Sequence, residues 1–152
     1  YHDLYKKRRK DWDEIPYLEI AKKIKKCPEW IVADMGCGEN LLSKEVSNKV
    51  HAFDYVAIDK DVTACDMSSI PLADQEINAI VFCLSLMGSN YLDYIKEGFR
   101  VTKPYGNIFI CEPKKKVEKR IEVLKKEIES IGFKIIEVTT SSQFVYIHGI
   151  KL

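Results

Sequence analysis

Two glycines and three aspartates are spaced in a way that could bind a small cationic ligand. Gly36 and Gly38 follow the apolar run "WIVADM", and Asp34 stands two residues before the first glycine. Asp54 and Asp66 close the next two apolar runs along the chain. Because ligands bind at the carboxyl edge of a parallel sheet, three acids at successive strand ends favour a site there. Each acid taken alone could instead be a helix cap or a solvated turn residue.

The glycine spacing argues against a dinucleotide. A dinucleotide-binding loop has the pattern G-x-G-x-x-G, and the third glycine position here is Leu41. Asp34 would also repel phosphate, whereas it would attract a cation. A ligand with an ammonium and a sulfonium but no phosphate fits, so we expect S-adenosylmethionine, with S-adenosylhomocysteine as its product. A plain strand-to-helix turn is the simpler interpretation of Gly36 and Gly38 taken alone.

Position in the chain suggests a role for each residue. Asp54 follows Asp34 by about 20 residues, where a carboxylate accepts ribose hydroxyls in such folds. Asp66 could accept the adenine amino group, with Met67 packing on the ring. The backbone of Gly36 is expected to touch the ligand, so Gly36→Ala should abolish binding and leave the stability of the ligand-free protein nearly unchanged.

Strands and helices alternate around these residues. Apolar residues at helical spacing predict helices over 14–26, over 91–102 and from Val117 to Ile131, the last ending at Gly132. The segment 41–48 has room for at most two helical turns. The segment Lys103-Pro104-Tyr105-Gly106 is expected to close the helix predicted over 91–102. Apolar runs predict seven strands, over 30–35, 50–58, 62–67, 77–86, 107–113, 134–140 and 143–150.

This order of elements predicts an α/β fold. Strand–helix alternation is typical of a Rossmann-like, mostly parallel seven-stranded sheet with helices on both faces. The last two strands are separated only by Ser141-Ser142 and should form a C-terminal antiparallel hairpin. At 152 residues we expect a single domain, with a basic segment and helix over 1–28 and the ligand-binding core over 29–152.

Charge and composition limit the alternatives. Residues 1–26 hold nine basic and five acidic residues, a net charge of +4. The run "KKRRK" at Lys6 to Lys10 could meet phosphates, or it could be a solvated helix face. No apolar run approaches the roughly 20 residues that cross a bilayer, so we expect no membrane association.

The cysteines and histidines do not form a metal site in this interpretation. The five cysteines are odd in number and include no C-x-x-C pair, which favours reduced, buried thiols. His2, His51 and His148 do not stand at ligand spacing from them, so we expect no metal.

Several segments together resemble a known family. In order and spacing, "ADMGCG", "VHAFD", "VTACDMSSIPL", "VFCLSLMGSN" and "FRVTKPYG" are similar to the nucleomethylin-type ribosomal RNA-processing protein 8 family. The resemblance implies a class I S-adenosylmethionine-dependent methyltransferase that forms N1-methyladenosine in large-subunit ribosomal RNA. It also implies a place in the nucleus and nucleolus, with ribosomal RNA and nuclear proteins as partners.

The resemblance adds two residues to the cofactor site. Periodicity alone places Cys83 in the core, and His2 would be an ordinary terminal residue. Matched position by position, the family implies a cofactor site of His2, Gly36, Asp54, Asp66, Met67 and Cys83. The argument from residue chemistry adds Asp34 and Gly38.

The segment "LSLMGSN" (84–90) should lie at the mouth of the pocket. Ser85 and Asn90 could hydrogen-bond the edge of a base, and Met87 could pack on its face. Asn90 could equally cap the helix that follows. Adenine N1 carries a lone pair and needs no deprotonation, so alignment should do most of the work. N1 is hidden in a base pair, so the base must be single-stranded or extruded.

Two other functions remain open at this point. The chain could be a cofactor-binding scaffold in a chromatin or ribosome-assembly complex, with little turnover. It could also methylate a small molecule or a protein.

Overall fold

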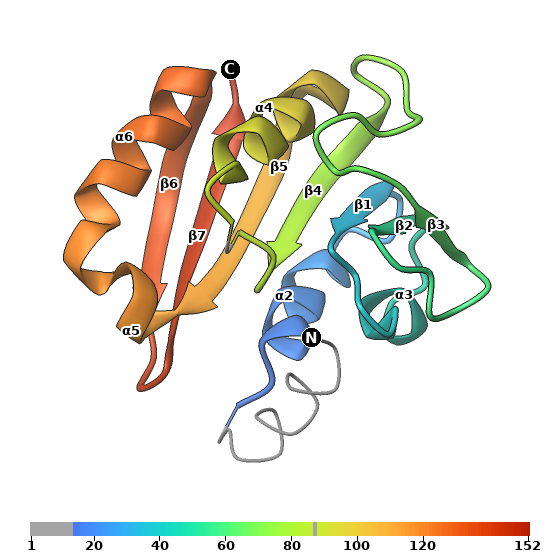
Figure 1. Ribbon diagram of the computed structural model, residues 1–152, viewed down its shortest axis with the longest axis horizontal. Coiled ribbons are helices and arrows are strands. Elements are labelled where there is room, and N and C mark those ends of the chain that lie inside the picture. The colour runs from blue at the N-terminus through green and yellow to red at the C-terminus, as the bar shows by residue number, and fades with distance from the viewer. Residues whose placement is uncertain (1–13, 87) are drawn as a thin grey trace.

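The computed structural model describes residues 14–86 and 88–152, and it is built around one seven-stranded sheet (Figure 1). The strands are β1 Val32–Met35, β2 Val50–Asp54, β3 Val62–Ala64, β4 Ile77–Cys83, β5 Thr102–Pro113, β6 Phe133–Thr140 and β7 Phe144–Lys151. The helices are α2 Pro16–Ile24, α3 Leu41–Glu45, α4 Tyr91–Val101, α5 Lys114–Val117 and α6 Ile121–Ile131, with a 3₁₀ turn, η1 Glu118–Arg120, before the last.

The strand order confirms the predicted fold class. The sheet runs β3-β2-β1-β4-β5-β7-β6, and all neighbours are parallel except that β7 is antiparallel to both β5 and β6. The chain leaves β1 towards β2 on one side and returns to β4 on the other. Strand order therefore reverses between β1 and β4, and a crevice opens there at the carboxyl edge.

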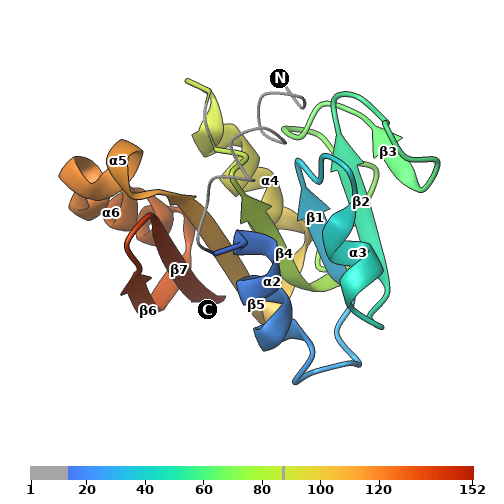
Figure 2. The same cartoon turned by 90° about the horizontal axis from the view of Figure 1, so that it is seen from below.

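Two apolar layers hold helices against the two faces of the sheet. On one face, Tyr94 and Ile95 of α4 and Ile128 of α6 pack in one core cluster. On the other, Ile24 of α2 and Leu42 of α3 pack in a second cluster. Figure 2 looks at the carboxyl edge and shows α4 and α6 on one side of the sheet and α2 and α3 on the other. Burial on both faces explains why β4 reads as a continuous apolar run.

Two local predictions were wrong. The segment Lys103–Gly106 does not close a helix, because α4 ends at Val101 and β5 already begins at Thr102. A register shift in the β4–β5 pairing absorbs the segment as a bulge, in which Tyr105 has a φ of 65°. The apolar stripe from Val117 to Ile131 is not one helix either, since η1 separates α5 from α6.

The predicted end of the last helix is confirmed. Gly132 follows the last helix with a φ of 131°, and a Cβ there would lie 2.4 Å from a ring carbon of Phe99. All five cysteines are free thiols, but only Cys111 is buried, so the predicted burial was wrong for the other four, which are half-buried. Within residues 14–86 and 88–152, no helix is long and apolar enough to span a membrane. In the same ranges, no group of three or more His, Cys, Asp or Glu is arranged to hold a metal ion.

Candidate functional site

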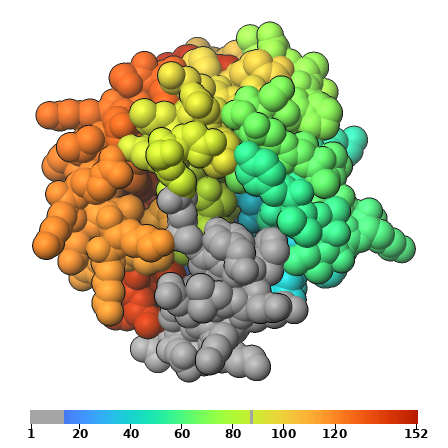
Figure 3. All heavy atoms as spheres, viewed as in Figure 1, coloured from blue at the N-terminus to red at the C-terminus, as the bar shows by residue number. Residues whose placement is uncertain are grey.

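A cavity of about 660 Å³ opens at the carboxyl edge of the sheet. Its walls come from the segments that follow β1, β2, β3 and β4, together with the start of α2 and one side chain of α4. Figure 3 shows a hollow in this face, bordered by the start of α4 and by the loops after β2 and β3. The strand ends that the sequence singled out therefore meet at one cavity, of a size that suits a nucleoside-sized ligand.

The glycine loop after β1 is held against β2. The backbone N–H groups of Gly36 and Cys37 both donate to the Phe53 carbonyl oxygen, at 2.8 and 3.0 Å. Gly36 and Gly38 have φ values of 77° and 56°, a left-handed conformation that L side chains rarely adopt. The turn thus depends on glycine for its backbone shape.

Gly36 is also pressed against the opposite wall. A Cβ at this position would lie 2.5 Å from the Ser85 Cβ and 3.5 Å from the Met67 sulfur. The expectation that Gly36→Ala leaves the ligand-free protein nearly unchanged is therefore wrong. The Cβ that alanine adds must displace the loop after β4, and it does so whether or not a ligand is bound.

Asp34 is a buried acid at the end of β1. It lines the cavity, and its side chain is almost entirely shielded from solvent. Burial, followed by the nearby charge of Asp54, raises the pKa of the Asp34 carboxyl to about 7. An uncompensated carboxylate in such a place is poised to receive a cation.

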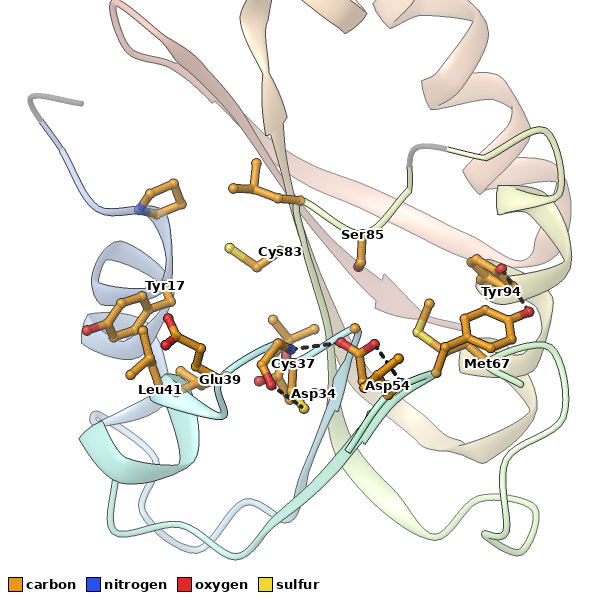
Figure 4. Close-up of a pocket in the computed structure, with 18 of the residues that line it drawn as sticks. Tyr17, Asp34, Cys37, Glu39, Leu41, Asp54, Met67, Cys83, Ser85 and Tyr94 are labelled. Atoms are coloured by element: carbon orange, nitrogen blue, oxygen red, sulfur yellow. Dashed lines mark hydrogen bonds between the residues drawn. The ribbon is translucent and has the colours of Figure 1, made fainter. Parts of the chain in front are cut away.

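Asp54 is oriented by the glycine loop. One carboxylate oxygen accepts the Gly38 N–H at 2.9 Å, and the other accepts the Val56 N–H at 3.4 Å. Each carboxylate oxygen keeps a second lone-pair direction, so Asp54 can still accept hydroxyl donors. Figure 4 shows Asp54 in the middle of the cavity, between Ser85 and Asp34.

The two residues predicted after β3 are placed differently. Met67 is buried and lines the cavity next to Gly36. Asp66 is exposed and is not among the lining residues. Its carboxylate accepts the Ser68 N–H at 2.9 Å and the Ser68 hydroxyl at 2.7 Å, and these bonds lower its pKa. Contact between Asp66 and an adenine remains a prediction.

The thiols in the cavity wall are kept protonated. A hydrogen bond with Cys111 and burial raise the pKa of the Cys83 thiol well above its ordinary value. Burial, followed by the charges of Asp34 and Asp54, raises the pKa of Cys37. Since the thiolate is the nucleophilic form, neither thiol is prepared for covalent catalysis. Cys83 lines the cavity as the family resemblance implied, although its contact with a cofactor remains a prediction.

Of the two substrate-facing candidates that the structure describes, Ser85 is the better placed. It is buried, lines the cavity and points towards Asp54 (Figure 4). Its Oγ has no hydrogen-bond partner among the described residues. A buried hydroxyl without a partner is costly in a folded chain, so a ligand that pairs with it would bind with that advantage.

The other candidates are less informative. Asn90 stands at the N-cap position of α4, but its side chain makes no capping hydrogen bond. Its Nδ2 instead donates to the Tyr94 hydroxyl at 3.2 Å, and Tyr94 lines the cavity. Asn90 therefore reaches the site through Tyr94. His2 and Met87 lie outside the described residues, and their predicted roles stay predictions.

Sequence reasoning missed several residues of the site, among them Tyr17 and Glu112. Tyr17 comes from α2 and lines the cavity on the side opposite Tyr94 (Figure 4), a placement that no local pattern signals. Glu112, near the end of β5, is buried, and burial raises its pKa to about 7. It accepts the Leu86 N–H at 2.8 Å and so holds the loop that carries Ser85. An acid at the end of the run "NIFICEP" is the same signal that identified Asp54.

Comparison with known proteins gives one family match over almost the whole chain. A family profile described as "Hypothetical methyltransferase" matches residues 1–151. The chain is similar to "Ribosomal RNA-processing protein 8" of Rattus norvegicus, 39% identical over 149 residues, which are 96% of this chain and 32% of that protein. It is also similar to "25S rRNA (adenine(645)-N(1))-methyltransferase" of Schizosaccharomyces pombe, 36% identical over 147 residues, 88% of this chain and 46% of that protein.

These relatives are longer than the chain, which spans about a third to a half of their length. Among solved structures, the fold is similar to 1,6-didemethyltoxoflavin-N1-methyltransferase of Burkholderia thailandensis, with bound S-adenosylhomocysteine. The TM-score is 0.72 at 15% identity, over 98% of this chain and 84% of that one. At this identity the likeness speaks for the fold alone.

Proposed function

The chain belongs to the hypothetical methyltransferase family, and from this membership we propose that it is an S-adenosylmethionine-dependent methyltransferase domain that modifies ribosomal RNA. The observation that carries the proposal is the convergence of Gly36, Asp34 and Asp54 on one cavity at the carboxyl edge of the sheet. Relatives named as ribosomal RNA methyltransferase and processing proteins support the substrate class.

The residues present fit S-adenosylmethionine. Asp34 offers a buried negative charge to a ligand with an ammonium and a sulfonium, and Asp54 offers an oriented acceptor to ribose hydroxyls. The glycine loop brings bare backbone to the cavity floor, and Met67 supplies a polarizable wall for an aromatic ring. When bound, this cofactor supplies an electrophilic methyl group.

The substrate is proposed to be an adenosine in large-subunit ribosomal RNA, methylated at N1. Its N1 lone pair can attack without deprotonation, so the chain needs no general base. The task left to the protein is to hold the base in line and exclude water. We propose that Ser85, which lines the cavity, hydrogen-bonds the base edge, and that Glu112 supports it by holding the loop that carries Ser85.

The cavity suits a base taken out of a helix. Adenine N1 lies on the Watson–Crick edge, which pairing hides, so the target must be unpaired or extruded. Tyr17 and Tyr94 stand on opposite walls and offer two aromatic surfaces to rings that enter. We propose that residues 1–152 act as one domain in this role.

A ribosomal RNA substrate also suggests where the protein works. We propose the nucleus and nucleolus as its location, with nuclear proteins of ribosome assembly as further partners. The names of the relatives as ribosomal RNA-processing proteins support this assignment.

The test is methyl transfer from labelled S-adenosylmethionine to unmodified large-subunit ribosomal RNA. After digestion to nucleosides, the label is expected in N1-methyladenosine, and ribonuclease treatment of the substrate should abolish it. Label in another nucleoside would refute the substrate. Cofactor binding without transfer to any RNA, protein or small-molecule pool would instead favour the scaffold function.

A further inference from the structure

A short basic segment stands beside the cavity, far in the sequence from the basic N-terminal run. Residues 114–120, "KKKVEKR", which form α5 and η1, hold five basic residues and one acidic residue, a net charge of +4. We call these seven residues the basic segment. The chain as a whole has a net charge of only +1, so this segment concentrates positive charge strongly.

The segment lies at the same edge of the sheet as the cavity. It follows directly from the carboxyl end of β5, next to the strand β4 whose end lines the cavity. Figure 2 shows α5 at this edge, and Figure 3 shows the orange stretch that carries α5 and α6 flanking the hollowed face. Lys115, Lys116, Lys119 and Arg120 are all exposed there.

One contact ties the segment to the start of α4, directly after the loop that borders the cavity. The Arg120 guanidinium donates to the Tyr91 hydroxyl at 2.7 Å and lies 5.4 Å from the centre of the Tyr91 ring. Tyr91 begins α4, directly after the loop 84–90. Arg120 therefore lies against the residue that follows the loop 84–90. Within that loop, the Leu86 N–H donates to Glu112. The positive charge of Lys116 opposes the rise in the pKa of Glu112 that burial causes.

Two lysines of the segment carry charge that no acidic side chain pairs with in the part of the chain that the structure describes. Arg120 has an ion pair with Glu127 at 3.5 Å. No ion pair involves Lys115 or Lys119 within the described part of the chain. Flexible, exposed lysines that lack acidic partners are suited to the phosphates of a strand rather than to one fixed ligand.

We propose that the basic segment is the docking surface for the RNA strand next to the target nucleotide. Phosphates of that strand lie along Lys115, Lys116 and Lys119, while the target base turns into the cavity past the loop 84–90. Arg120, braced by Tyr91, fixes the direction of the segment relative to that loop. This inference rests on the proposed methyl transfer to RNA and names the part of the chain that receives the RNA backbone.

The test uses two triple variants of the chain with the same change in charge. The first is Lys115→Gln, Lys116→Gln and Lys119→Gln. The control is Lys26→Gln, Lys49→Gln and Lys134→Gln, three exposed lysines away from the basic segment. The RNA probe is a short fluorescent single-stranded oligoribonucleotide with one adenosine, whose binding is followed by anisotropy over a salt series. Cofactor binding is measured by calorimetry.

The basic-segment variant is expected to lose at least about tenfold in RNA affinity at low salt. Its plot of log affinity against log salt should be shallower by about 2, because three phosphate contacts on a single strand contribute about 0.7 each. In methyl transfer the KM for RNA should rise while kcat changes little, and cofactor affinity should stay that of the parent. The control variant should match the parent in its salt slope.

The outcomes separate this inference from the proposed function. Equal RNA binding by the two variants would overturn the docking surface, even if the parent methylates RNA. Selective loss of RNA binding with no methyl transfer by the parent would support the docking surface and refute the proposed reaction. Displacement of RNA by poly-glutamate as effectively as by unlabelled RNA would assign the segment to an acidic protein and overturn the inference.

Discussion

Replacing Asp34 with asparagine should stabilise the ligand-free protein and weaken cofactor binding. The substitution keeps the shape of the side chain and removes a buried charge. The pKa of Asp34 is raised from an ordinary value of 3.8 to about 7. At about 1.4 kcal/mol per pH unit, ionising it in the folded protein costs about 4 kcal/mol at most.

The sign of the pH dependence follows from the two pKa values. Below about pH 4 the carboxyl is protonated in both the folded and the unfolded chain, and it does not affect stability. Between about pH 4 and 7 the unfolded chain ionises first, so the folded state loses stability as pH rises. Above about pH 7 the loss stays constant.

Urea unfolding without cofactor measures this directly. Asp34→Asn should exceed the parent in free energy of unfolding by about 1.5 kcal/mol at pH 5 and by up to about 4 kcal/mol at pH 8. Asp61→Asn, the same change at an exposed position, is the control and should shift stability by less than about 0.5 kcal/mol. A parent and an Asp34 variant with the same pH profile would refute the assigned burial cost.

Three further predictions concern the same cavity. Asp54→Ala should weaken S-adenosylmethionine binding at least about tenfold, because charge-assisted hydrogen bonds contribute about 1.5–3 kcal/mol; unchanged affinity in calorimetry would contradict the role of Asp54. Gly36→Ala should lower the free energy of unfolding by at least about 2 kcal/mol from strain and the clash with Ser85. Thermal unfolding of Gly36→Ala combined with Ser85→Gly should recover part of that loss, and no recovery would argue against the clash. Ser85→Ala should raise the ligand-free free energy of unfolding by about 1 kcal/mol, since it removes a buried hydroxyl that has no partner among the described residues, and should lower kcat for RNA; a normal kcat would exclude Ser85 from substrate contact.

The sheet and half of the site could be predicted because both depend on local pattern. Strand–helix alternation gave the parallel sheet, and topology brings the ends of its strands to one edge. Asp34, Asp54, Met67 and Ser85 could therefore be placed together from their positions after apolar runs. The sequence indicated correctly that position 36 needs glycine, but it did not indicate the close approach of Ser85. That contact joins two loops that are far apart in the sequence.

The remaining residues depend on long-range packing or on competing local bonds. Tyr17 reaches the cavity only because α2 packs across β1 and β4 on the face that α3 shares, which no spacing rule encodes. Asp66 occupies the predicted strand end, but Ser68 captures its carboxylate. The bulge at Lys103–Gly106 looks like a helix stop in sequence, because Pro and Gly mark both.

A calorimetric titration of the chain with S-adenosylmethionine, and separately with a nicotinamide dinucleotide, tests the central claim most directly. The account predicts saturable one-to-one binding of S-adenosylmethionine, tighter at pH 8 than at pH 6 because Asp34 ionises near pH 7. It predicts no detectable binding of the dinucleotide, whose phosphates Asp34 repels. Binding of the dinucleotide in preference to S-adenosylmethionine, or of neither ligand, would contradict the assignment of this cavity as a methyl-donor site.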